Sequence, residues 1–151
     1  MTAVIRQIEP RDLPALVGLC KEHAAYERSE FCDNGQLERL PVAFFGLQPK
    51  LHGWVVESGN QLVGFMTVTV DFATWTADHF LHMDCLYLKE EFRRKGLGRR
   101  LIAELKRFGQ DRNISLIQWQ TPTHNIDGIH FYEEIGAYSK DKKRYFLAIE
   151  S

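Results

Sequence analysis

Residues 86–101, LYLKEEFRRKGLGRRL, decide how this chain of 151 residues folds. The stretch predicts a strand that leads through a charged turn and a glycine-containing loop into a helix. Backbone N–H groups at a helix start have no partner within the helix and carry the positive end of its dipole, so they bind phosphate groups well. Gly96 and Gly98 have no Cβ and let the main chain approach such a group closely. The stretch therefore predicts a pyrophosphate-binding loop.

Basic side chains surround these glycines. They are Arg93, Arg94, Lys95, Arg99 and Arg100. The whole chain has a formal net charge of −1, so this positive charge is local and favours a small anionic ligand over nucleic acid or an anionic membrane. The P-loop pattern GxxxxGK[ST] is absent, and Leu101 stands where the dinucleotide pattern GxGxxG needs its third glycine. The pattern that remains is Arg-x-x-Gly-x-Gly between a strand and an amphipathic helix.

Composition and cysteine usage indicate a globular, cytoplasmic protein. The 44% of hydrophobic residues and 26% of charged residues are ordinary for such a protein. We find no apolar run long enough for a membrane span and no signal-peptide pattern, so no membrane partner is expected. Cys20, Cys32 and Cys85 are odd in number and form no CxxC pair, which favours reduced thiols. The length, without repeats or linkers, predicts a single domain over residues 4–151.

Strand and helix signals alternate along the chain. Strands are expected at 4–8, 53–57, 61–70, 79–88, 115–121 and 143–149. Helices are expected from Pro10 to about Glu27 and at 36–45, 98–111 and 125–135. Such a mixture without a break in composition predicts an α/β fold.

The histidines do not form a metal site in this reading. His79 and His82 are three residues apart on an expected strand, so their side chains point to opposite faces. His124 and His130 match no zinc spacing. We therefore expect no metal. In a regular strand His82 shares a face with Asp84, which makes His82 one candidate general base.

The stretch 86–101 resembles the acyl-CoA-binding motif of the GNAT superfamily of N-acetyltransferases, and the order of expected elements fits that family over residues 4–149. The resemblance implies the GNAT acyl-CoA N-acyltransferase fold, with a mixed, mostly antiparallel central sheet flanked by helices. It also implies that acetyl-CoA is the co-substrate and that its pantetheine arm pairs with the strand residues Leu86, Tyr87 and Leu88. The loop residues expected to hold the pyrophosphate are Arg93, Arg94, Lys95, Gly96, Leu97, Gly98 and Arg99.

Residues 125–137, NIDGIHFYEEIGA, are similar to a second family segment, N-x-x-(A/S)-x-x-F-Y-x-x-x-G-(F/A). The resemblance implies that Asn125 contacts the CoA arm and that Tyr132 protonates the departing thiolate. A phenol with a pKa near ~10 can donate a proton as negative charge develops on sulfur. Gly128 stands where alanine or serine is usual, a change that lowers helix propensity.

Tyr26 and Glu27 end the first expected helix and resemble a Tyr-Glu pair of the polyamine (spermidine/spermine-type) acetyltransferase branch, where the pair contacts the amine. Asp84 stands where that branch has a longer glutamate. The resemblance implies that these carboxylates hold a cationic amine, whereas the alternative is that they are solvated charges. The general base stays open between Glu27, Asp84, His82 and water. The same branch implies a homodimer, with Trp75 as the candidate subunit contact.

These features favour an N-acetyltransferase that moves an acetyl group from acetyl-CoA to a primary amine of a small molecule by direct attack. The expected acceptor is a polyamine, a diamine or an amino-acid analogue. A protein acetyltransferase acting on lysine or N-terminal amines is the nearest alternative. A non-catalytic CoA-binding regulatory module is another, and Tyr132 and Asn125 argue against it. A nucleic-acid-binding domain conflicts with the net charge.

Overall fold

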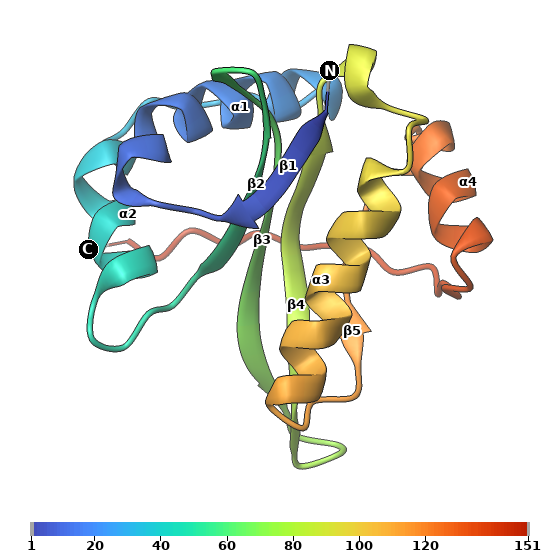
Figure 1. The fold of residues 1–151 in the computed structure, drawn as a ribbon. Coiled ribbons are helices and arrows are strands. Elements are labelled where there is room, and N and C mark those ends of the chain that lie inside the picture. Colours follow the sequence, from blue (N-terminus) through green and yellow to red (C-terminus); the bar gives the residue numbers. More distant parts are fainter. Residues whose placement is uncertain (1, 151) are drawn as a thin grey trace. The chain divides into compact units, whose positions relative to one another are not determined.

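The computed structural model describes residues 2–150, which fall into two units, one that ends at Gln120 and one that starts at Thr121. The first unit contains a five-stranded sheet with the helices α1, α2 and α3. The second unit contains α4 (Ile126–Glu134) and a C-terminal segment without regular secondary structure (Figure 1). Whether the two units form one domain stays a prediction.

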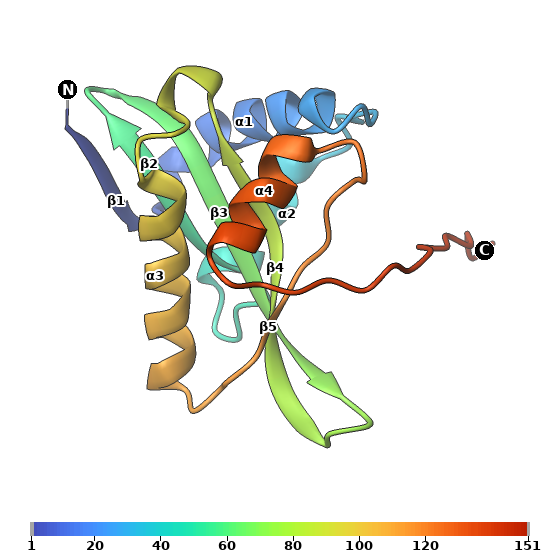
Figure 2. The same cartoon turned by 90° about the vertical axis from the view of Figure 1, so that its right-hand side faces the viewer.

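The sheet is mixed and mostly antiparallel, as predicted. Its strands are β1 (Ala3–Gln7), β2 (His52–Ser58), β3 (Gln61–Ala73), β4 (Asp78–Leu88) and β5 (Ile117–Gln118). They lie in the order β1-β2-β3-β4-β5, with every neighbouring pair antiparallel except β4 and β5, which are parallel. The long β3–β4 hairpin extends past the end of α3 (Leu97–Asp111) (Figure 2).

Helices cover both faces of this sheet (Figure 1). The helices α1 (Leu13–Tyr26) and α2 (Gln36–Phe45) cover one face. Apolar residues at helical spacing on these two helices meet alternate strand residues in one core of Ile8, Leu13, Leu16, Leu19, Phe44, Val55, Leu62, Phe65 and Tyr87. On the other face, Phe108 of α3 lies edge-on against Trp54, with 5.4 Å between the ring centroids. None of the helices within residues 2–150 is long and apolar enough to cross a membrane.

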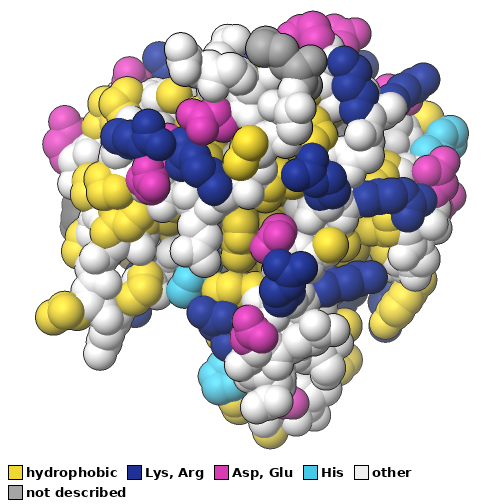
Figure 3. Space-filling view, viewed as in Figure 1, with side chains coloured by type: hydrophobic (Ala, Val, Ile, Leu, Met, Phe, Trp, Pro, Cys, Tyr) yellow, Lys and Arg dark blue, Asp and Glu magenta, His cyan; other side chains and the backbone are white. Residues whose placement is uncertain are grey.

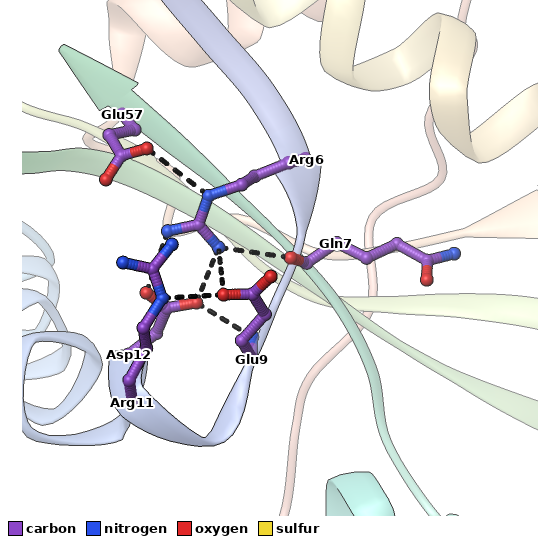
Figure 4. A network of polar contacts seen from close by, with 6 residues as sticks. All are labelled: Arg6, Gln7, Glu9, Arg11, Asp12 and Glu57. Atoms are coloured by element: carbon purple, nitrogen blue, oxygen red, sulfur yellow. Dashed lines mark hydrogen bonds and ion pairs between the residues drawn. The ribbon is translucent and has the colours of Figure 1, made fainter.

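A partly buried charge network joins β1 to the start of α1 (Figure 4). The Arg6 guanidinium donates to both oxygens of Asp12, at 2.7 and 2.9 Å, and also to Glu57 at 3.4 Å. Asp12 ends the short 3₁₀ helix η1 (Pro10–Asp12), is only 5% exposed, and accepts from the Glu9 N–H at 2.8 Å. These donors, Arg6 above all, hold the pKa of the Asp12 carboxyl below its ordinary value of 3.8.

A β-bulge interrupts β4 at Asp84. Thr67 of β3 pairs with Cys85, whereas the next residue, Val68, pairs with Met83, so Asp84 is one extra residue. The bulge reverses which face the following residues occupy. Leu81 lies beside Gly109 of α3, but Tyr87 and Cys85 pack on the α1 side. His82 and Asp84 are expected to share a face because side chains alternate between the two faces of a regular strand. The bulge breaks this alternation between the two residues.

Most expected elements form within a few residues of their predicted bounds, with two departures. The strand expected at 115–121 is reduced to Ile117–Gln118. The strand expected at 143–149 is wrong: these residues have no regular secondary structure and are exposed. A strand needs a neighbour for its backbone hydrogen bonds, and the described part of the second unit contains no other strand.

Candidate active site

The glycine loop has a left-handed backbone that opens the start of α3. After β4, the 3₁₀ helix η2 (Glu90–Phe92) leads to Arg94, with a φ of 61°, and to Gly96, with a φ of 83°. Gly96 is the N-cap of α3 and has no side chain to cap the first N–H groups. A Cβ built at Gly96 would meet no atom within 4 Å, so the space beside the helix start is open. This geometry suits an anion at the N-terminus of a 15-residue helix.

Positive charge lies around this helix start. Arg94, Lys95, Arg99 and Arg100 are exposed, whereas Arg93 is half-buried. The outer face of α3 continues the basic character with the exposed residues Lys106 and Arg107, and basic side chains gather over α3 in the space-filling view (Figure 3). The local field therefore favours a negatively charged group at the loop although the chain as a whole is nearly neutral.

One edge of β4 is paired with another described strand over two residues only. Within the described residues, β5 pairs with β4 only at Leu81 and His82. Beyond these two residues, β4 pairs with β3 along one edge and with no strand of this sheet along the other. An extended ligand can form backbone hydrogen bonds with such an edge as an added strand would. The residues Leu86–Leu88, predicted to hold the pantetheine arm, lie in this section.

The predicted acceptor pair lies against the predicted cofactor strand. Tyr26 is the last residue of α1 and Glu27 is its C-cap. His23 Nε2 and Glu27 Oε2 are 3.0 Å apart, and the His23 ring stacks on Tyr87 of β4 with 5.4 Å between centroids. Tyr26 meets the same Tyr87 ring edge-on at 6.3 Å. The structure therefore brings Tyr26 and His23 against Tyr87, and Glu27 is joined to this group through His23.

Arg93 joins the same group. Its Nε donates to the Leu88 carbonyl at 2.8 Å, and its Cζ lies 4.5 Å from the centroid of the Tyr26 ring and 5.5 Å from that of Tyr87. The sequence pattern placed Arg93 among the loop cations but gave no sign of these contacts. They depend on where α1 ends relative to β4.

Glu22 and Lys89 are two further members that the sequence analysis missed. Glu22 accepts hydrogen bonds from the Tyr87 hydroxyl at 3.3 Å and from Lys89 Nζ at 3.0 Å. Burial, and next the Glu22 carboxylate, raise the pKa of the Tyr87 phenol. One signal was available, because Glu22 lies one helical turn before Tyr26 and therefore on the same side of α1.

Asp84 lies farther along β4. It is exposed at the bulge, and the Cys85 thiol donates to its carboxylate at 3.7 Å. Burial, followed by the charge of Asp84, raises the pKa of the Cys20 thiol to about 11, and the same two causes raise that of Cys85. Cys85, next to Asp84, packs against the same core as Cys20, which precedes Glu27 by about two turns of α1.

Asn125 and Tyr132 belong to the second unit. Asn125 is the buried N-cap of α4: its Oδ1 accepts from the Gly128 N–H at 3.2 Å, and its Nδ2 donates to Thr121 at 2.8 Å. A Cβ at Gly128 would lie 2.8 Å from Asn125 Cγ, which explains glycine at this position. The half-buried Tyr132 ring packs against Phe131 with centroids 5.6 Å apart.

The sheet, the bulge and the glycine loop before α3 point to one class of protein. Comparison of the sequence with known families identifies that class. Residues 13–137 match the Acetyltransferase (GNAT) family, and the chain belongs to this family. It is therefore an N-acetyltransferase, which confirms the predicted family, fold and enzyme class.

Two characterised relatives and one solved structure are similar to this chain. It is 26% identical over 129 residues to thialysine N-epsilon-acetyltransferase of Caenorhabditis elegans, covering 85% of this chain and 78% of the relative. It is 26% identical over 145 residues to a D-amino-acid N-acetyltransferase of Saccharomyces cerevisiae, covering 94% of this chain and 88% of the relative. A predicted acetyltransferase of Clostridium acetobutylicum with acetyl-CoA has the same fold, with a TM-score of 0.80 at 17% identity over 97% of this chain and 96% of that chain. The names of the two relatives are consistent with the polyamine-type branch.

Proposed function

We propose that this acetyltransferase moves the acetyl group of acetyl-CoA to a primary amine of a small molecule such as a polyamine, a diamine or an amino acid with an amino side chain. The observation that carries the proposal is that Tyr26 packs against Tyr87, in the strand that leads into the glycine loop, while Glu27 contacts His23, whose ring stacks on Tyr87. A carboxylate there attracts an alkylammonium group close to the proposed thioester. The names of the two relatives, which specify thialysine and D-amino acids, also support a small acceptor.

On the donor side, the open start of α3 and its cations suit the CoA pyrophosphate. In this proposal the backbone N–H groups of residues 94–99 and the side chains of Arg94, Lys95 and Arg99 bind the phosphates. The pantetheine arm lies along the edge of Leu86–Leu88, and Asn125 contacts it. Gly96 leaves room for this approach because it has no Cβ. Its φ of 83° also disfavours any other residue at this position.

The reaction forms a C–N bond and breaks a C–S bond. A free alkylammonium has a pKa near ~10.4, so the acceptor first loses a proton to Glu27, Asp84, His82 or a water molecule. The amine nitrogen then attacks the thioester carbonyl carbon, and strand N–H groups near Leu86 stabilise the negative charge on oxygen. As the C–S bond breaks, the Tyr132 hydroxyl donates its proton to the sulfur. The nitrogen loses its second proton as the amide forms, and that proton returns through water to the Tyr132 phenolate.

An amine panel tests this proposal. The full chain is mixed with acetyl-CoA and with diamines, polyamines, lysine analogues or lysine-containing peptides, and the released CoA thiol is measured. We expect saturable release with small amines. Release with peptides alone would indicate a protein acetyltransferase, and binding of acetyl-CoA without release by any amine would indicate a CoA-binding module.

We also propose a cytoplasmic homodimer. The C-terminal segment carries Tyr145, Phe146, Leu147 and Ile149, each between 80% and 98% exposed, in a stretch whose sequence favours a strand. A second copy would cover these apolar side chains. The exposed Trp75 is a further candidate contact, and three free cysteines suit the reducing cytoplasm. Light scattering of the full chain should give about twice the 17.5 kDa of one chain, and a monomeric mass would contradict the dimer.

A further inference from the structure

We propose that Arg93 is a positioning residue that fixes the end of α1 against the start of the glycine loop. One side chain then keeps the segment proposed to bind the amine and the segment proposed to bind CoA in a fixed position relative to each other. The inference rests on the proposed function, because it concerns how CoA affinity and amine recognition depend on each other.

The contacts of Arg93 differ from those expected of a phosphate ligand. Its neighbours Arg94 and Lys95 are exposed, but Arg93 is half-buried. Its Nε is used in the 2.8 Å hydrogen bond to the Leu88 carbonyl, and its guanidinium covers the Tyr26 and Tyr87 rings at 4.5 and 5.5 Å. A planar, weakly hydrated guanidinium stacks on aromatic rings in a way that a lysine ammonium does not reproduce.

Arg93 joins two segments at which the chain leaves a helix. On one side, α1 ends at Tyr26, Glu27 follows as C-cap, and Arg28 turns the chain with a left-handed φ of 58°. On the other side, Arg93 is the C-cap of η2 and precedes Gly96 by three residues. If the Arg93 contact is lost, α1 keeps its contacts with Tyr87 and Lys89 but loses its contact with the residue that leads into the glycine loop.

This role predicts an effect of Tyr26 on CoA affinity, although Tyr26 belongs to the acceptor side. Tyr26→Leu removes the ring under Arg93 without changing charge, and Arg93→Lys keeps the charge but loses both the stacking geometry and the Nε hydrogen bond. We expect each substitution to weaken CoA binding by about 3- to 10-fold, the range of a partly desolvated cation–π contact. Because both remove the same contact, the double variant should bind no more than about 2-fold more weakly than the worse single variant.

Isothermal titration of CoA into the wild-type chain and these three variants tests the proposal. Arg107→Lys, an exposed residue of α3 paired with Glu104, is the matched control for an arginine-to-lysine change and should bind CoA as the wild type does. Tyr26→Phe keeps the ring and should bind CoA more tightly than Tyr26→Leu, and this comparison stands even if the Arg93 variant fails to fold. The KM for the amine should rise in Tyr26→Leu and Arg93→Lys alike.

Two results would overturn the inference. One is an Arg93→Lys variant with wild-type CoA affinity, which would make Arg93 a simple charge near the phosphates. The other is a double variant whose loss of affinity equals the product of the two single losses, since independent residues behave in that way. A wild-type chain that binds no CoA would instead refute the proposed function, before any variant is measured.

Discussion

Asn125 begins α4 through its hydrogen bond from the Gly128 N–H, and the family resemblance also assigns it a contact with the CoA arm. Its buried amide is fixed from both ends, because Nδ2 donates to Thr121 while Oδ1 serves the helix. Gly128 leaves the space that this side-chain position needs. A residue that is fixed in this way by local structure is well suited to hold one orientation toward a ligand.

This packing predicts an unusual change in stability when Gly128 is replaced by alanine. Glycine-to-alanine in a helix normally stabilises by about 1 kcal/mol. Here the new Cβ displaces Asn125, and loss of an N-cap costs about 0.5–2 kcal/mol, so Gly128→Ala should give no net stabilisation. In an Asn125→Ala background the same change should stabilise by about 1 kcal/mol. Urea unfolding measures both, and a gain of about 1 kcal/mol in the wild-type background would contradict the prediction.

Tyr132 is proposed to donate the proton that the CoA thiolate needs. Tyr132→Phe removes only the hydroxyl, so kcat should fall by about 100-fold or more, the usual effect of losing a general acid. CoA affinity should stay within about 2-fold of wild type, because the ring remains. Steady-state kinetics with acetyl-CoA and the best amine measure kcat, with Tyr138→Phe at an exposed tyrosine as control. An unchanged kcat would show that another group protonates the sulfur.

Among the secondary-structure elements, β1, η1 and β2 are joined by the network of Arg6, Asp12 and Glu57 (Figure 4). The folded-state pKa of Asp12 is lowered, so its stabilising contribution is fully present above its ordinary value of 3.8 and is lost as the pH falls below that value. Asp12→Asn should therefore reduce the free energy of unfolding by about 2–3 kcal/mol at pH 7, and by less at pH 3. Urea unfolding at both pH values tests this, and an equal loss at both would contradict it.

The pattern of apolar residues predicted most elements because each has a clear period. The α3 residues Leu101, Leu105 and Phe108 recur at helical spacing and are buried as expected. The bulge at Asp84 left no such signal, since one extra residue changes no composition. The expected strand at 143–149 had the right residue types, but a strand also needs a partner edge, which a single sequence does not supply.

The candidate site was predictable where its chemistry is local. A glycine loop before a helix is readable from consecutive residues, and so is a Tyr-Glu pair at a helix end. The contacts of Arg93 with Tyr26 and of Glu22 with Lys89 join residues 67 positions apart in each case. Such contacts arise only when α1 packs on β4. The helical spacing of Glu22 and Tyr26 indicates only that they share a side of α1.

In the whole molecule, the match to the GNAT family runs from residue 13 to 137 and so includes parts of both units. That the two units form the single domain predicted from the sequence stays a prediction. The proposed function assigns roles to the glycine loop, the β4 edge and the acceptor pair, which belong to one unit, and to Tyr132 and Asn125, which belong to the other. The proposed reaction needs all of them, so transfer of the acetyl group tests the complete assignment more directly than binding does.

The decisive measurement is the rate of CoA thiol release from acetyl-CoA by the full chain, with small diamines, polyamines and lysine analogues compared with lysine peptides at equal amine concentration. We predict release that saturates with both acetyl-CoA and a small amine, with a kcat/KM for the best small amine at least about 100-fold above that for any peptide, a difference of about 2.7 kcal/mol. A kcat/KM that is higher for peptides, or no release with any amine despite acetyl-CoA binding, would contradict the proposed function.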